Sequence, residues 1–216
     1  MERDARLIKN IQNLSQFQKF IGLLAGRVGQ IVNISSLAND TGISPNTAED
    51  WISILESSYI VYRLQPYYKN MSKRLIKSPK IFFYDTGLLC ALLNISSAKQ
   101  LISHFAVGSI FENFIVSEFK KEISATNKSV NIYFYRDNHG NEIDLIIDTG
   151  TGLVPIEIKS SATYNSSFFT GFEYWKKYID KHTQGYVVYG GKNTQKVQNN
   201  NLVSWNKLSL LFDRIA

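Results

Sequence analysis

The sequence predicts a mixed α/β protein of the α+β class, with a mostly helical domain over residues 1–95 and a mixed domain over residues 96–216. The first part reads as short helices followed by two strand candidates. The second part reads as a helix, three strands, a helix and a strand. Within it, residues 142–159 alternate apolar and charged side chains with the period of two that is typical of strands.

The composition limits the classes of protein to consider. Of 216 residues 44% are hydrophobic, which is enough for a core, and the net charge of +6 permits contact with nucleic acid without requiring it. No apolar run is long enough to span a membrane, and no signal peptide precedes the first helix. Cys90 is the only cysteine, and the three histidines lack ligand spacing. We therefore expect a soluble cytoplasmic protein without disulfides, zinc or membrane contact.

Residues 35–57 read as two helices joined by a turn at Gly42. Ser35 or Ser36 can cap the first helix, which ends near Thr41. The second helix starts at Ser44-Pro45, with the serine at N-cap and the proline at the first helical position. Residues 59–64 and 80–84 are strand candidates, so a helix–turn–helix precedes a β-ribbon. This order is the winged-helix pattern.

The charges of this region argue against simple major-groove recognition of DNA. The second helix holds three acidic residues and no lysine or arginine, so it would repel phosphates. The ribbon over residues 66–80 is basic instead, and it supplies the candidate nucleic-acid-binding residues Lys69, Lys73, Arg74, Lys77 and Lys80. A solvated ribbon that contacts another protein is an equally good interpretation.

Residues 81–95 read as a strand end, a turn and a buried helix, with Asp85 as a helix cap rather than a catalytic group. Residues 96–105 read as the connector between the domains. The next helix covers residues 108–123, and Glu112 and Glu118 lie within or beside its apolar stripe. An acid among aromatic side chains needs a partner, a metal ion or a raised pKa.

The remaining elements are three strands, a helix and a last strand. A strand over residues 131–137 precedes the alternating hairpin, and a helix over residues 166–182 and a strand over residues 185–189 follow it. The polar residues 192–201 read as a loop.

The hairpin carries the candidate chemistry. Alternation puts Asp144 and Ile146 on one face and Ile143 and Leu145 on the other, while Glu157 and Lys159 share a face. The hairpin could therefore bring together Asp144, Glu157 and Lys159. Two carboxylates and an ammonium suit a Mg²⁺-dependent phosphodiesterase. An ordinary hairpin with a solvated charged face is the alternative, and the hairpin alone favours it.

The order of elements and the motif resemble the core of the PD-(D/E)xK nuclease superfamily. Asp144 is followed by twelve residues and then by Glu157-Ile158-Lys159. The resemblance implies that Asp144 and Glu157 bind Mg²⁺ and that Lys159 supports the nucleophilic water. It also implies an acidic ligand on the first core helix, where Glu112 matches best and Glu118 second. Ile143 stands where the family name has proline.

A second resemblance covers nearly the whole chain, from about Glu2 through Tyr189. Segments such as FFYDTGLLC, YFYRD and PIEIKSS resemble the uncharacterised region that follows the ATPase module in many bacterial and archaeal AAA-superfamily ATPases. The chain lacks the P-loop motif, so it is not the ATPase itself. We expect an excised fragment or a stand-alone product, with an ATPase module as partner in cis or in trans.

Two functions remain open at this stage. The chain is either a metal-dependent nuclease that cleaves nucleic acid, or a non-catalytic module that binds nucleic acid or a protein and regulates the ATPase. The sequence leaves open whether it is an enzyme, which nucleic acid it prefers and whether it forms an oligomer.

Overall fold

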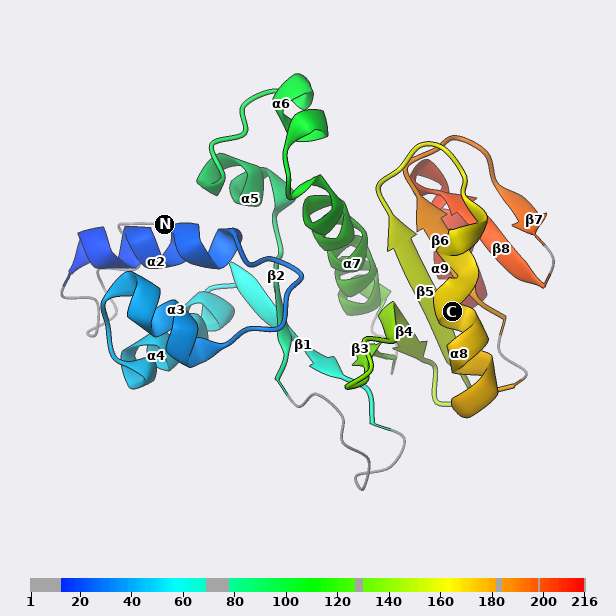
Figure 1. Ribbon diagram of the computed structural model, residues 1–216, viewed down its shortest axis with the longest axis horizontal. Coiled ribbons are helices and arrows are strands. Elements are labelled where there is room, and N and C mark those ends of the chain that lie inside the picture. Colours follow the sequence, from blue (N-terminus) through cyan, green and yellow to red (C-terminus); the bar gives the residue numbers. More distant parts are fainter. Residues whose placement is uncertain (1–12, 69–77, 127–129, 182–183, 198, 216) are drawn as a thin grey trace. The chain divides into compact units, whose positions relative to one another are not determined.

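The computed structural model describes residues 13–68, 78–126, 130–181, 184–197 and 199–215 (Figure 1). The chain divides into two compact units. The N-terminal unit comprises Met1–Arg63 and Ser78–Asn113, and the C-terminal unit comprises Leu64–Lys77 and Phe114–Ala216. Helices combine with an eight-stranded mixed sheet, which confirms the α+β class.

The N-terminal unit begins with three helices: α2 (Leu14–Ala25), α3 (Ile34–Thr41) and α4 (Pro45–Ser57). The α4 ring of Trp51 contacts two α2 rings edge-on, with centroids 5.2 Å from Phe17 and 5.3 Å from Phe20. These three aromatic side chains are almost fully buried, so they form the centre of this helical core.

The helix ends follow the predicted chemistry with one correction. Ser44 caps α4 by accepting the Thr47 N–H, and Gly42 ends α3 in the left-handed conformation with φ +85°. The predicted cap of α3 at Ser35 or Ser36 is wrong. Asn33 is the cap, because its Oδ1 accepts the Ser36 N–H at 2.9 Å.

The rest of the N-terminal unit contains β2 (Lys80–Phe83), α5 (Thr86–Leu92), α6 (Ala98–Ser103) and the start of α7 (Val107–Thr126). Asp85 caps α5 as predicted, accepting the Leu88 N–H. The predicted connector contains α6, a helix with a Ser97 cap and no buried residue. Asn113 of α7 is fully buried, and its amide accepts from the Phe83 N–H and donates to the Phe83 carbonyl. This two-way contact fixes the start of α7 against β2.

The C-terminal unit is built on a sheet. Its strands are β3 (Asn131–Arg136), β4 (Glu142–Asp148), β5 (Leu153–Lys159), β6 (Tyr186–Tyr189), β7 (Gln195–Val197) and β8 (Asn200–Ser204). They follow the order β1-β3-β4-β5-β6-β8-β7, where β1 is Val61–Pro66, and β2 is the neighbour of β1 in the N-terminal unit. The β3–β4 and β4–β5 pairs are antiparallel, and the β5–β6 and β6–β8 pairs are parallel.

The observed order α7, β3, β4, β5, α8 (Thr170–Tyr178), β6 has the predicted sequence of element types. Two details differ. The helix predicted over residues 166–182 starts with a 3₁₀ turn, Ser166–Phe169, and α8 ends at Tyr178. The loop predicted over residues 192–201 is wrong, because β7 pairs with β8 and β8 pairs with β6. Short polar strands of this kind are stabilised by pairing rather than by their own alternation pattern.

Both faces of the central strands are buried. On one face, the α8 residues Phe172 and Trp175 pack in a cluster with Ile146, Val187 and Leu202. On the other face, Leu145 and Ile147 are also fully buried. The last helix, α9 (Ser209–Ile215), follows a short 3₁₀ turn, Trp205–Lys207. No helix among the described residues has the length and apolarity that a membrane crossing requires.

Candidate carboxylate–lysine site

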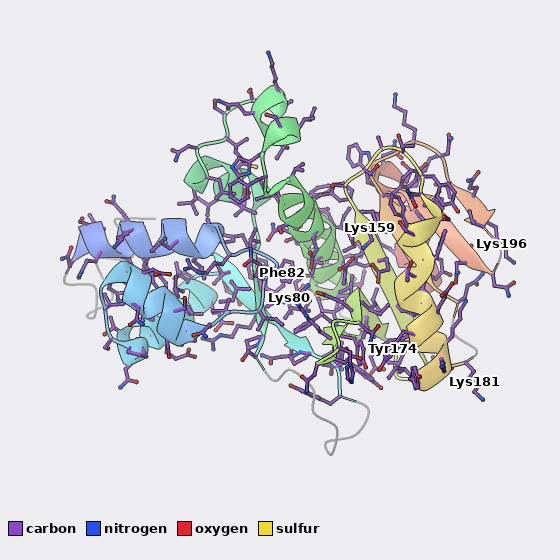
Figure 2. The ribbon with its side chains drawn as sticks, viewed as in Figure 1. Lys80, Phe82, Lys159, Tyr174, Lys181 and Lys196 are labelled. Carbon is purple, nitrogen blue, oxygen red and sulfur yellow. The ribbon has the colours of Figure 1, made fainter. Side chains whose placement is uncertain are left out.

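The structure brings Asp144, Glu157 and Lys159 together in the C-terminal unit. The Lys159 Nζ lies 2.5 Å from Glu157 Oε2 and 3.3 Å from Asp144 Oδ2. Glu157 and Lys159 are two residues apart on β5 and so share a face, as predicted (Figure 2 labels Lys159). We call these three residues the carboxylate–lysine cluster.

A bulge in β4 positions Asp144. Tyr133 pairs with Ile146, but Tyr135 pairs with Ile143, so β4 has one residue more than β3 over this stretch. Ile143 and Ile146 consequently pack in the same cluster under α8. The predicted placement of Ile143 on the opposite face from Ile146 is therefore wrong, because strict alternation stops at the bulge.

The Asp144 carboxylate lies just beyond the end of the regular β4–β5 pairing. The β4–β5 pairing is regular from Asp148↔Leu153 to Leu145↔Ile156. Immediately beyond it, Asp144 Oδ2 accepts the Ile158 N–H at 2.7 Å. A side-chain oxygen thus takes the place of a backbone acceptor, which fixes the carboxylate beside Glu157.

The charged face of the hairpin is not solvated. The side chains of Asp144 and Glu157 are only 14% and 7% exposed, and Lys159 is 32% exposed. The interpretation of an ordinary hairpin with a wet face is therefore wrong for this part of the strand. Helix α8 packs over that face of the sheet instead.

Gly171 brings the first turn of α8 into contact with the cluster. A Cβ at this position would overlap Glu157 Oε1 and lie 2.9 Å from the Glu142 carbonyl oxygen. Any side chain would collide with both, so the backbone of α8 approaches Glu157 as closely as it does only because residue 171 is glycine.

A hydrogen-bond network anchors α8 one turn later. The Tyr174 side chain hydrogen-bonds to Asp137 and to Tyr135, and burial together with these bonds raises the pKa of Tyr174. The Asp137 carboxylate also accepts from the His139 and Asn141 backbone N–H groups. Burial opposes ionisation of Asp137, but the donors outweigh it and lower its pKa. Asp137 therefore ties the β3–β4 turn to α8.

The cluster brings two carboxyl groups to one ammonium. Burial, and next the neighbouring Asp144, raise the pKa of Glu157 well above its usual range, despite the contact with Lys159. Burial lowers the pKa of Lys159, but the two carboxylates outweigh it and raise that pKa. Two acids share one ammonium, so a second cation at this point would be stabilised.

The donor set suits Mg²⁺. This ion takes hard oxygen ligands, keeps several waters and is commonly held by one or two carboxylates together with substrate phosphates. Asp144 and Glu157 supply two such carboxylates. Among the described residues, no group of three or more His, Cys, Asp or Glu side chains could hold a metal ion. Any ion here would therefore depend on water or substrate for its other ligands.

The remaining predicted site residues lie elsewhere. In the N-terminal unit the Glu112 carboxylate pairs with Lys80, with Nζ 2.9 Å from Oε1. Lys80 is 2% exposed, so its ammonium is enclosed in this pair rather than presented to a phosphate. Glu118 pairs with Lys121 at the surface. The predicted nucleic-acid contacts Lys69, Lys73, Arg74 and Lys77 lie outside the described residues.

Sequence reasoning missed Gly171, Tyr174 and Asp137. One signal was present for Gly171: glycine inside a predicted helix costs stability, so it suggests a close approach of the backbone to a neighbour. The aspartate at the start of the Asp137–Asn141 turn is a common turn residue, and nothing in its pattern indicated the distant tyrosine partner.

Two family models match adjoining parts of the chain. Residues 1–99 match a family described as a domain of unknown function, DUF8612, and residues 107–208 match another domain of unknown function, DUF4143. Uncharacterized proteins of Mycobacterium tuberculosis and Mycobacterium bovis are each 29% identical to this chain over 141 residues. That segment covers 65% of this chain and 31% of each mycobacterial protein.

An archaeal relative is also uncharacterized. The protein of Methanocaldococcus jannaschii is 28% identical over 115 residues, which is 52% of this chain and 24% of that protein. The matched segment is thus about a third or less of the length of these relatives. No solved structure gives a significant match.

Proposed function

We propose that the carboxylate–lysine cluster is a metal-dependent site for hydrolysis of phosphodiesters in nucleic acid. One observation carries this proposal. Two acids are buried side by side against a single lysine, and the pKa of Glu157 is raised as a result. A protein that needed only a stable hairpin would gain nothing from crowding two carboxylates, whereas a cation-binding site requires it.

Each residue has a distinct part in the proposed reaction. Asp144 and Glu157 would hold Mg²⁺, which supplies charge neutralisation at the phosphate and makes a bound water more acidic. Lys159 would hold the attacking water or pair with a phosphate oxygen through its ammonium. The Ile158 N–H keeps Asp144 in place, and α8 limits the access of bulk water to Glu157 through the contact at Gly171.

The wider setting is proposed as a nuclease domain that works with an ATPase module. Support comes from the match of residues 107–208 to DUF4143, a domain often found in the C-terminal regions of AAA ATPases. The basic residues Lys69, Lys73, Arg74 and Lys77 and the net charge of +6 favour contact with a polyanion. Cleavage should then weaken as salt rises, because counterions compete for the phosphates.

The test combines metal binding with cleavage. Mn²⁺ titration by calorimetry should show one site in the unmodified protein, and plasmid and single-stranded DNA should be cut when Mg²⁺ or Mn²⁺ is present. Glu157→Gln and Asp144→Asn should each remove both properties, because each loses an anionic ligand. Glu118→Gln is the matched control, since that acid pairs with Lys121 at the surface. Cleavage that persists in both site variants would refute the proposal.

A non-catalytic regulatory module is the second candidate. The contacts of Lys159 with both carboxylates favour it, because the ammonium already serves as an internal counter-ion. In this case no metal binds and nothing is cut. The double change Lys73→Glu and Arg74→Glu would then weaken binding to nucleic acid or to an ATPase partner. Binding that survives this change would exclude a role for the basic ribbon.

A further inference from the structure

A cleft in the C-terminal unit lies apart from the residues of the carboxylate–lysine cluster. It has a volume of about 440 Å³ and is lined by residues of β7, β8 and α9, together with Gln184 and Thr194. Ligand-binding clefts commonly have volumes of this order. Its size therefore suits a small organic molecule.

The alternation of β8 produces the floor of the cleft. Leu202 packs in the cluster under α8, and the Asn200 Oδ1 accepts from Lys176. Asn201 and Val203, the alternate residues, line the cleft. Leu211 of α9 completes a buried apolar floor, and Leu210 lies at the exposed rim. One part of the cleft is thus apolar.

The amide of Asn201 points to a ligand. Its Nδ2 is buried and has no hydrogen-bond partner among the described residues. The buried Asn113 differs, because its Nδ2 donates to the Phe83 carbonyl and to the Thr86 hydroxyl. A buried hydrogen-bond donor without an acceptor lowers stability. A bound ligand that supplied the acceptor would remove this cost.

The charge of the cleft indicates which kind of acceptor group would bind there. Lys196 is the cross-strand partner of Asn201 in the β7–β8 pair, and its side chain is exposed at the outer hairpin of the sheet (Figure 2). Among the described residues that line the cleft, none is acidic. A cation and an amide donor side by side favour a carboxylate. Val203 lies two residues after Asn201 on β8, roughly 7 Å away. Together with Leu210 and Leu211 it lines the part of the cleft that can hold the aliphatic chain of a ligand.

We propose that this cleft binds a small aliphatic carboxylate. One carboxylate oxygen accepts from Asn201 Nδ2, the charge pairs with Lys196, and a chain of about five or six carbons lies on Val203 and Leu211. This site would be independent of the proposed hydrolysis, because none of its residues belongs to the carboxylate–lysine cluster.

The test uses hexanoate as the probe and two-dimensional ¹H–¹⁵N spectra of the 216-residue chain. Hexanoate should shift the Asn201 side-chain amide signals in a saturable way, with a dissociation constant on the order of 1 mM for so few atoms. Acetate and 1-hexanol should bind at least about fivefold more weakly, because one lacks the aliphatic body and the other lacks the charge.

Variants assign the contacts. Lys196→Gln and Asn201→Leu should each weaken hexanoate binding about fivefold or more, and Lys192→Gln, an exposed lysine outside the lining, should leave it unchanged. Lys196 is exposed, so its variant tests the site without disturbing the core. The proposal is overturned if the Asn201 amide does not respond, if it binds a water molecule only, or if hexanol binds as well as hexanoate. Unchanged binding in both variants would also overturn it.

Discussion

Each unit of the protein buries a lysine against carboxylates, and the two arrangements differ in charge balance. In the N-terminal unit Lys80 pairs with Glu112, and the two side chains are 2% and 15% exposed. In the C-terminal unit Lys159 meets two acids, Asp144 and Glu157. The Lys80–Glu112 ion pair brings together one ammonium and one carboxyl group, whereas the carboxylate–lysine cluster brings two carboxyl groups to one ammonium.

This difference separates a structural role from a functional one. A balanced buried pair can hold two elements together, here β2 and α7, although it adds little stability over an apolar replacement. An unbalanced cluster lowers stability, so it persists where a further cation or a reaction makes use of it. The number of acids around a buried lysine is therefore more informative about function than the presence of a lysine–acid contact.

Lys80→Met should produce the largest effect on stability. It removes the cation of a largely buried ion pair, and breaking such a pair costs about 3–5 kcal/mol. Urea unfolding should show this loss, while Mn²⁺ binding by the other unit should be retained. The double variant Lys80→Met with Glu112→Gln should recover most of the stability, because both charges of the pair are removed together.

Lys121→Met is the control for the loss of a lysine from an exposed pair, and it should change stability by less than about 1 kcal/mol. If Lys80→Met is as mild as this control, the Lys80–Glu112 pair is not a structural contact, and the contrast between the two units fails.

Gly171→Ala should have the next largest effect, and it acts where α8 meets the carboxylate–lysine cluster. The added methyl group would overlap Glu157 Oε1 and the Glu142 carbonyl, and overpacking of this kind costs about 1–3 kcal/mol. Displacement of the carboxylate should also weaken Mn²⁺ binding. The measurements are urea unfolding and Mn²⁺ calorimetry.

A compensating change distinguishes displacement of Glu157 from a general loss of folding. Glu157→Asp shortens the side chain by one methylene, so in the Gly171→Ala background it should restore part of the stability. In the background with Gly171 it should lower stability instead. Additive effects of the two changes would mean that the contact between α8 and Glu157 does not position the carboxylate.

The parts of the carboxylate–lysine cluster that could be predicted from the sequence are those that depend on residues near one another in the chain. Alternation along β5 correctly placed Glu157 and Lys159 on one face, because that pattern is local. The bulge at Asp144 depends on pairing with β3, and Gly171 meets Glu157 only after α8 packs on the sheet. Sequence patterns carry no register between strands, so these two features required the structure.

The Lys80–Glu112 pair was not predicted for the same reason, because its two residues are far apart in the sequence. The position of Glu112 beside an apolar stripe correctly indicated a need for a partner, but not which partner. Its lysine is 32 residues earlier in the chain and was interpreted as part of a basic surface ribbon. Charge alone did not distinguish an exposed lysine from a buried one. The Ser44 and Asp85 caps were predicted correctly because capping depends on residues only three apart.

Glu157→Gln should stabilise the metal-free protein, in contrast to the loss at Lys80. It removes the excess negative charge and keeps the shape of the side chain, so a gain of about 1 kcal/mol is expected near pH 8. The pKa of Glu157 is raised in the folded state, so ionisation opposes folding. That cost is present above the folded pKa and disappears as pH falls below the unfolded value near 4.3.

The measurement is urea unfolding of both proteins in a chelator at several pH values. The advantage of the Glu157→Gln variant should shrink towards acid pH, and its Mn²⁺ binding should be absent. If this variant is less stable than the original at pH 8, then the cluster is a satisfied ion-pair network and the proposed distinction between the units is incorrect.

Tyr174→Phe should have the smallest effect and adds a third type of buried acid to the comparison. Asp137 is held by N–H and O–H donors, and they lower its pKa. Loss of one hydroxyl donor should cost about 1 kcal/mol at pH 7. A lowered folded pKa contributes stability above the unfolded value near 3.9, and this contribution is lost as pH falls through the folded pKa. The difference between the two proteins should therefore narrow below about pH 4.

Phe169→Leu, in the residue before α8, is a control for packing, because it changes the apolar contacts of that turn without touching Asp137. Its effect should not depend on pH in the acid range. If the Tyr174→Phe difference is likewise independent of pH, then Tyr174 stabilises α8 through its ring rather than through Asp137. The acid in the β3–β4 turn would then need no partner on α8, and neutral donors from its own turn would be sufficient to keep a buried carboxylate ionised.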